Sequence, residues 1–204
     1  MDRRYFIKST ALSGIALGLG RVETLIKSHI LTLSFDDGFK KSFYRVADIF
    51  EGHGLSACFN VIASGHFPGF EKVDPWILPE LLGDFDDWNN LKSRGHEVMP
   101  HSWKHLNLAK QPFEEAQAWI TKCLVYFQEN LEGYRNEEAV FNFPFNASTP
   151  ELEAYTLSKV LALRAHEIPR SAPAAKNVFR QGCRSHGPGN IDDWIENQIN
   201  TFLA

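Results

Sequence analysis

The sequence predicts an α/β fold in which parallel strands alternate with helices. Short apolar and β-branched runs, typical of buried strands, alternate with longer segments whose apolar residues have helical spacing. The chain has 204 residues, of which 44% are hydrophobic, so it is long enough for one domain with a sizeable core. Alternation of this kind is consistent with a (β/α) barrel but does not exclude an open, doubly wound sheet.

The N-terminal segment differs in kind from the rest of the chain. A basic start, Arg3-Arg4-Tyr5-Phe6-Ile7-Lys8, precedes a mildly apolar run over residues 9–20. This is the pattern of an export signal, and its basic part resembles the twin-arginine type. We therefore expect residues 1–20 to direct export to the periplasm or the extracellular space. An amphipathic N-terminal helix is the alternative. No other run is apolar and long enough to cross a membrane.

The first predicted strand covers residues 30–35 and leads into Asp36, Asp37 and Gly38. Its β-branched and apolar residues favour a buried strand. Two adjacent carboxylates are costly to bury, and a cation beside them would remove that cost. A solvated Asp-Gly turn is the alternative. Because neighbouring residues of a strand point to opposite sides, Asp36 and Asp37 need not have the same role.

The later elements follow from helical spacing, capping residues and short apolar runs. Helices are predicted over residues 40–50, 78–93, 112–131, from Thr149 onward, and 192–203. Strands are predicted over residues 57–62, near 97, over 139–143 and 159–163, and near 180–185. In the second helix, Asp84, Asp86 and Asp87 are expected on a solvated face.

Residues 95–105 contain a second polar cluster at the end of a predicted strand. His101 and His105 are four residues apart, and on a helical turn this spacing places both imidazoles on one face. Two histidines and one carboxylate are a common ligand set for catalytic zinc. Barrel chemistry lies at the carboxyl ends of strands, where both the Asp-Asp pair and the histidine pair fall.

These segments resemble the polysaccharide deacetylases, the carbohydrate esterases that include chitin, peptidoglycan and acetylxylan deacetylases. Ser34-Phe35-Asp36-Asp37-Gly38 and His101-Ser102-x-x-His105 match two motifs of that family. The resemblance covers residues 30–204. It implies a distorted (β/α) barrel, one divalent metal, usually zinc, and hydrolysis of an N- or O-acetyl group on a polysaccharide or oligosaccharide. It also implies Asp37, His101 and His105 as metal ligands and Asp36 as general base. Ser102 is expected to orient the loop.

A third family motif, Arg-x-Pro-Tyr-Gly, is altered here. Residues 142–146 place Asn142 at the arginine position and Phe145 at the tyrosine position. In the family this arginine pairs with the base, so its absence would tend to raise the pKa of Asp36. Asn142 can still hydrogen-bond to a carboxylate, and the backbone amide of Phe145 can still contribute to an oxyanion site. A strand that ends at a proline turn explains the segment equally well.

The C-terminal region matches the family least. Residues 190–194 loosely resemble an Asp-x-x-Asp-Trp motif, but a helix start with Trp194 packed inward is simpler. No strand-like run follows the helix at 192–203, and in the family the last strand carries the general-acid histidine. We therefore expect a barrel incomplete at the C-terminus, with poor turnover unless His186 substitutes for the acid.

Composition and unmatched features leave two other functions open. The net charge of −4 and the lack of a basic run argue against a nucleic-acid partner. Cys58, Cys123 and Cys183 are scattered, so we expect buried thiols and no disulfide framework. The alternatives are a degenerate, non-catalytic carbohydrate-binding domain and a cyclic-amide or formamide hydrolase on the same barrel. The sequence specifies neither the sugar nor the oligomeric state.

Overall fold

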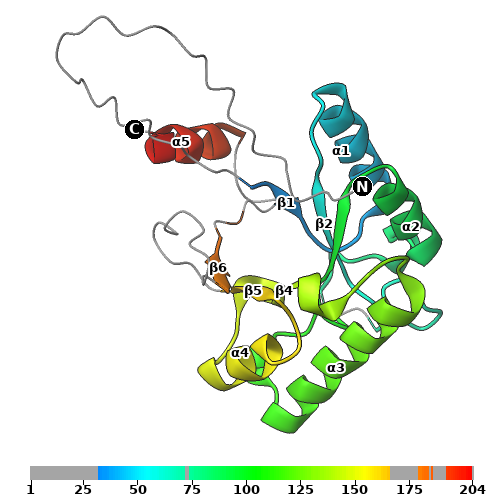
Figure 1. Cartoon of the computed structure of the whole chain (residues 1–204), viewed down its shortest axis with the longest axis vertical. Coiled ribbons are helices and arrows are strands. Elements are labelled where there is room, and N and C mark those ends of the chain that lie inside the picture. The colour runs from blue at the N-terminus through cyan, green and yellow to red at the C-terminus, as the bar shows by residue number, and fades with distance from the viewer. Residues whose placement is uncertain (1–31, 72–73, 166–178, 184, 186–191, 204) are drawn as a thin grey trace, which may run out of the picture.

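The structure is a computed structural model, and it describes residues 32–71, 74–165, 179–183, 185 and 192–203 (Figure 1). The predicted export segment at 1–20 and the candidate acid His186 lie outside the described residues. So do residues 190 and 191 of the loosely matched C-terminal motif.

The described part of the chain contains six short strands in two parallel sheets. The first sheet has the order β1 (Ser34–Phe35), β2 (Cys58–Val61), β3 (Glu97–Pro100), and the second has the order β4 (Val140–Asn142), β5 (Ala162–Ala165), β6 (Arg180–Gly182). Strands β3 and β4 are neighbours, because the Val140 amide lies 3.5 Å from Met99 Sδ. All of the pairings are parallel, which confirms the predicted α/β class.

The described residues contain five α-helices, each within or close to a predicted helical segment. They are α1 (Lys40–Gly52), α2 (Phe85–Ser93), α3 (Phe113–Asn130), α4 (Pro150–Leu157) and α5 (Asp192–Leu203). Four single-turn 3₁₀ helices lie between them, η1 (Pro79–Leu81), η2 (Leu108–Lys110), η3 (Asn136–Glu138) and η4 (Pro144–Asn146). Helices α2 and α3 pack against β3, and α4 packs against β5 (Figure 1). None of the described helices is long and apolar enough to span a membrane.

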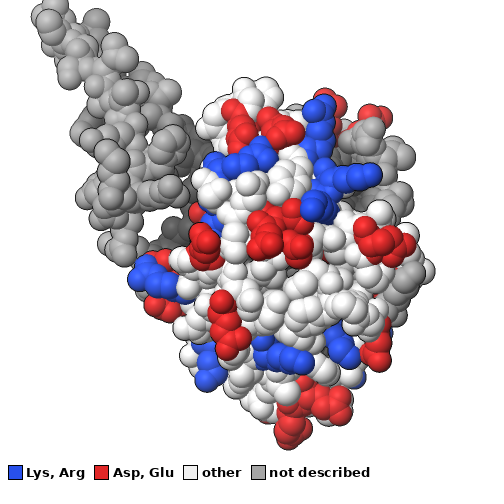
Figure 2. Space-filling model, turned by 90° about the vertical axis from the view of Figure 1, so that its right-hand side faces the viewer, with Lys and Arg blue, Asp and Glu red and all other residues white. Residues whose placement is uncertain are grey.

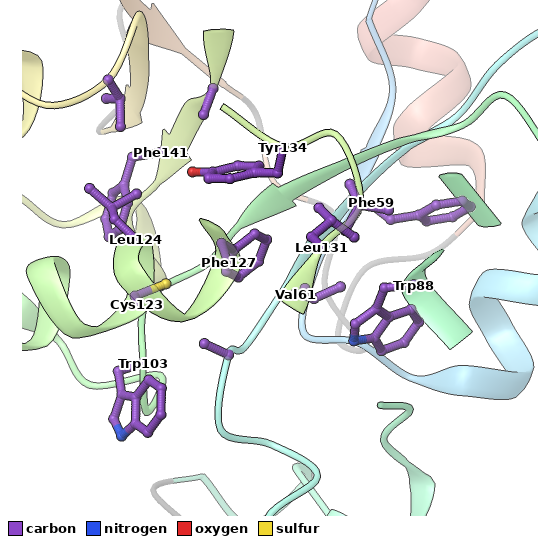
Figure 3. Packing of buried hydrophobic residues seen from close by; sticks show 14 of the residues in the cluster. Phe59, Val61, Trp88, Trp103, Cys123, Leu124, Phe127, Leu131, Tyr134 and Phe141 are labelled. Atoms are coloured by element: carbon purple, nitrogen blue, oxygen red, sulfur yellow. The ribbon is translucent and has the colours of Figure 1, made fainter. Parts of the chain in front are cut away.

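One aromatic core lies between the strands and helices α1 to α3. Phe43 of α1 stacks on Phe59 of β2 with 4.6 Å between ring centroids, and Trp88 of α2 closes the cluster at 5.5 Å from Phe43. Figure 3 shows Phe127 of α3 in the same core, and it shows Leu131 between Phe127 and Phe59. Burying each such side chain stabilises the fold by about 1.5–3 kcal/mol. This core fixes the strand ends that carry the polar residues.

The first predicted strand is shorter and more exposed than expected. Residues 30 and 31 of the predicted strand lie outside the described residues. Of residues 32–35, two form strand β1, and Leu33 before it is 44% exposed. The strand predicted over residues 159–163 is found at residues 162–165 as β5, because α4 and the turn after it extend to residue 161. The two segments are therefore correct in type but wrong in extent.

The acidic residues near α2 also differ from expectation. The helix starts only at Phe85, because Asp84 caps it by accepting a hydrogen bond from the Asp87 amide, with the reciprocal bond also formed. Asp87 is not solvated: it is 8% exposed and forms an ion pair with Lys40 at 2.8 Å. The predicted solvated face therefore contains Asp84 and Asp86 but not Asp87.

The three cysteines, all of which the structure describes, form no disulfide. Cys123 is fully buried, as predicted, whereas Cys58 and Cys183 are half-buried. Charged side chains on the face shown in Figure 2 are of both signs and interspersed, without a continuous basic stripe. The expectation of no nucleic-acid partner stays a prediction.

Candidate metal centre

Asp37, His101 and His105 come together beyond the carboxyl ends of β1 and β3. One ligand atom of each lies within 4.8 Å of the others. Asp37 Oδ1 is 3.5 Å from His101 Nε2 and 3.3 Å from His105 Nε2. Both histidines are buried, and Asp37 Oδ1 is buried with no hydrogen-bond partner among the described residues. A buried carboxylate oxygen without a donor, facing two imidazole nitrogens, is what a bound cation would satisfy.

Left-handed backbone conformations, rather than a helical turn, bring the two histidines together. Ser102 has a φ of 67° and His105 a φ of 55°, and the imidazole centroids lie 5.1 Å apart. The prediction that the pair shares a face of a helical turn is therefore wrong. The loop is instead held by the Val61 carbonyl, which accepts from the His101 amide, and by the Ala63 amide, which donates to the Ser102 carbonyl.

The turn after β1 also contains left-handed backbone conformations. Asp37 has a φ of 79° and Gly38 a φ of 98°, both in the left-handed region. A Cβ at Gly38 would also lie 3.3 Å from the indole of Trp88. Only glycine combines this backbone conformation with this close approach. The Asp-Asp-Gly order therefore places the second carboxylate over the strand ends before α1 begins.

Each histidine is oriented by a hydrogen bond at its other ring nitrogen. His101 Nδ1 lies 2.8 Å from the Asn142 carbonyl, and His105 Nδ1 lies 2.6 Å from Asp74 Oδ2. A carbonyl or carboxylate oxygen can only accept, so Nδ1 carries the proton in both rings. Each Nε2 then presents its lone pair to Asp37, as expected of a metal ligand with an outer hydrogen-bond partner.

Asp74 was not found from the sequence. It is only 8% exposed, it lies in the loop before η1, and it belongs to no recognised motif. An Asp-Pro pair in a loop gives no signal beyond turn formation. Burial and the proximity of His101 lower the pKa of His105, outweighing Asp37 and Asp74, so the ring is neutral at pH 7. Neutral imidazole is the form that binds metal.

Asp36 is held by a different set of groups. Its Oδ1 accepts from Asn60 Nδ2 at 2.7 Å and from Arg164 Nη1 at 2.9 Å, and its Oδ2 accepts from Arg164 Nη2 at 2.5 Å. Burial acts to raise the pKa of Asp36, but His101, Arg164 and Asn60 together hold that pKa well below its usual range. The expectation of a raised pKa is wrong, because an arginine on β5 supplies the missing cation.

Arg164 was the second residue that the sequence analysis missed. It lies inside an apolar strand, Ala162-Leu163-Arg164-Ala165, and is 8% exposed. A charged residue is almost never buried in such a position unless it is paired. That rule could have identified Arg164 as a candidate site residue, but it could not have identified Asp36 as its partner.

The predicted third-motif residues line the centre in ways that differ from expectation. The Asn142 side-chain amide donates to the backbone carbonyls of Val140 at 2.9 Å and Pro100 at 3.4 Å. Asn142 therefore contributes to the centre through its backbone carbonyl, which accepts from His101 Nδ1, and not through a hydrogen bond to a carboxylate. The Phe145 ring lies 4.8 Å from the His105 ring and is 44% exposed, and its backbone φ is 57°.

Ser102 is fully buried, and its hydroxyl has no hydrogen-bond partner among the described residues. A nucleophilic serine needs a base within hydrogen-bond reach. This argues against Ser102 as a nucleophile, and its role in orienting the loop stays a prediction.

Comparisons with known proteins bear on the family and the fold. A family model described as polysaccharide deacetylase matches residues 26–159. No curated protein matches. A solved de-N-acetylase from Aggregatibacter actinomycetemcomitans is similar with a TM-score of 0.63 at 12% identity, over 81% of this chain and 73% of that one. IcaB from Ammonifex degensii is similar with a TM-score of 0.63 at 16% identity, over 84% and 71%.

A third similar structure is described as a CE4 family pseudoenzyme from Bacillus anthracis. Its TM-score is 0.50 at 14% identity, over 65% of this chain and 41% of that one. At these identities the three structures show a shared fold.

Proposed function

Because this chain belongs to the polysaccharide deacetylase family, we propose that it is a metal-dependent hydrolase that removes N- or O-acetyl groups from a carbohydrate. The observation that carries the proposal is the buried, unpartnered Oδ1 of Asp37 facing the Nε2 atoms of His101 and His105. The similar de-N-acetylase supports it at the level of fold. A distorted (β/α) barrel formed by the two sheets is part of the proposal.

Zinc is the metal we propose for this centre. Asp37, His101 and His105 would hold it, since two imidazoles and one carboxylate are a common catalytic zinc set. When bound, such a metal activates a water molecule and polarises an acyl carbonyl. The protein supplies neutral imidazoles of fixed tautomer, and it keeps both rings out of bulk solvent.

Asp36 is the general base in this proposal. Two donors already occupy its Oδ1, whereas its Oδ2 has one donor and lies 3.9 Å from His101 Nε2. Oδ2 therefore retains a lone pair beside the metal ligands, and the half-exposed carboxylate is accessible to water. Arg164 keeps the group ionised, so it can accept a proton from the attacking water.

Phe145 is the third-motif residue that we place against the substrate. Its exposed ring beside His105 offers an apolar surface to an acetyl methyl group. We further propose that its backbone amide stabilises the oxyanion, as the family resemblance implies. Asn142 holds His101 through its carbonyl and is a positioning residue in this scheme.

No general acid is identified among the described residues. Of the other described histidines, His53 is exposed at the end of α1, His66 lies beside Tyr126, and His96 lies beside Glu51 and accepts from the Ala57 amide. None of the three belongs to the metal cluster. We therefore propose impaired turnover unless His186, outside the described residues, provides the proton. This favours one alternative specifically, a carbohydrate-binding domain that retains the fold but not the activity, as in the similar pseudoenzyme.

Export and the substrate class complete the proposal. The twin-arginine-like start supports a periplasmic or extracellular protein, where acetylated polysaccharides are accessible. The acetylated polysaccharide or oligosaccharide is the proposed partner, and the domain that would bind it covers residues 30–204.

The test is acetate release combined with metal analysis on the same purified protein. Oligomers of N-acetylglucosamine and acetylated xylan would be compared with formamides and cyclic amides, before and after metal removal by a chelator and restoration with zinc. We expect about one zinc per chain and zinc-dependent acetate release. Zinc binding without release of any product would support the binding domain. Release from the small amides alone would support the cyclic-amide or formamide hydrolase.

A further inference from the structure

Asn142 and Arg164 occupy matching positions on neighbouring strands. In the parallel β4–β5 pair, Asn142 is the register partner of Arg164. Both side chains are buried. Residues in register on adjacent parallel strands point to the same face of the sheet, and the strands lie about 4.8 Å apart. An arginine side chain is longer than that spacing. An arginine can therefore be moved from one strand to the other and still reach the same carboxylate.

We propose that Arg164 is the positioning residue that holds Asp36 at the metal centre, and that it replaces an arginine at position 142 from one strand away. The inference rests on the proposed function for its catalytic part. Its geometric basis is the two-point contact of one guanidinium with one carboxylate, Nη1 to Oδ1 at 2.9 Å and Nη2 to Oδ2 at 2.5 Å. A planar fork of this kind fixes the rotation of a carboxylate as well as its charge.

Arg164 also connects the two sheets at this point. Its Nη1 donates to Ser34 Oγ at 2.9 Å as well as to Asp36, so β5 of the second sheet is tied to β1 of the first. Asn60 of β2 donates to the same Oδ1 from the other side. With Asn60 Nδ2 and Arg164 Nη1 bound to Oδ1 and Arg164 Nη2 bound to Oδ2, the remaining lone pair of Oδ2 is the one beside His101. The arrangement selects which carboxylate oxygen serves the reaction.

A double-mutant cycle on rate tests this role. The variants are Arg164→Met, Asp36→Asn and the double variant, all zinc-loaded, with acetate release from an N-acetylglucosamine oligomer as readout. We expect Arg164→Met to lower kcat by about 100-fold, within the contribution of a general base. In the Asp36→Asn background, the same substitution should cost less than about 3-fold, because residues that act as a unit are not additive. Zinc affinity should be the same within about 3-fold, because Arg164 contacts no ligand side chain.

An exchange variant tests the relocation itself. Arg164→Asn combined with Asn142→Arg restores an arginine at the position that the family resemblance implies. We expect it to recover at least about 10-fold in kcat over Arg164→Asn alone. Arg94→Ala is the matched control, since Arg94 contacts Asp48 and Glu51 at 2.7 and 2.8 Å near the amino end of β3, away from the centre. This control should leave kcat unchanged.

Equal losses from Arg164→Met in both Asp36 backgrounds would overturn the inference, because they would show a general structural role. So would loss of zinc from Arg164→Met. If the exchange variant fails to fold, the cycle alone decides. If the parent protein releases no acetate from any probe, the proposed function fails. The contact between Arg164 and Asp36 is then tested by denaturant unfolding of the zinc-free proteins. Asp36→Asn should suppress most of the loss in unfolding midpoint that Arg164→Met causes, and additive losses would overturn the inference.

Discussion

Replacing Asp74 with asparagine should weaken zinc binding without removing a ligand. Asp74 Oδ2 lies 2.6 Å from His105 Nδ1, and both side chains are buried, so the contact acts in a region of low dielectric constant. Asparagine can still accept through its amide oxygen but carries no charge. Outer partners of this kind are worth about 10–100-fold in metal affinity, or about 1.4–2.7 kcal/mol. We expect the upper half of that range.

The assay is competition for zinc against a chromogenic chelator, at constant pH and salt. Asp74→Ala should cost more than Asp74→Asn, because it leaves the buried Nδ1–H of His105 without any acceptor. Asp86→Asn is the matched control for charge, since Asp86 is exposed on α2. Parental zinc affinity in Asp74→Asn would refute the reasoning. An equal loss of affinity in Asp86→Asn would also refute it, because long-range charge and not ring orientation would then explain the effect.

Four further predictions concern the same strand ends. His105→Ala should lose most bound zinc, measured by metal analysis, while circular dichroism shows the fold retained. The parent should release zinc as the pH falls, because the lowered pKa of His105 keeps the ring neutral near pH 7 and protons displace the metal only at lower pH. Asp36→Asn should keep zinc but lose about 10²–10⁴-fold in acetate release, and near-parental rates would refute its role as base. Gly38→Ala should lower the free energy of unfolding by about 1–3 kcal/mol, measured in denaturant, since it combines a φ of 98° with a 3.3 Å approach to Trp88.

The sequence predicted the element types and the three residues that the structure brings together at the candidate metal centre, but not the extent of the first strand or the conformation of the histidine loop. The expected helical turn at 101–105 is absent because Ser102 and His105 adopt positive φ values without glycine. Non-glycine residues in this region are stabilised by tertiary contacts, here from the Val61 carbonyl and the Ala63 amide. Nothing in the local sequence encodes those contacts.

The residues that the sequence missed share one property, which is that their partners lie far along the chain. Asp74 is 31 residues from His105, and Arg164 is 128 residues from Asp36. Their roles depend on strand order and register, which periodicity does not specify. The third-motif match also placed the expected arginine position at Asn142 on β4, whereas the arginine that contacts Asp36 lies on β5. Register alone places Arg164 beside that position.

Strain and uncompensated charge are concentrated at the same end of the strands. Asp37, Ser102, His105 and Phe145 all have positive φ values, and each such residue costs about 1–3 kcal/mol. The carboxylates of Asp36 and Asp37 are adjacent, yet only Asp36 has a cationic partner among the described residues. The structure thus stabilises one carboxylate fully and leaves the other facing two neutral imidazoles. This difference supports the proposed roles of Asp36 as base and Asp37 as ligand, because a divalent cation is attracted most strongly to the carboxylate that Arg164 does not neutralise.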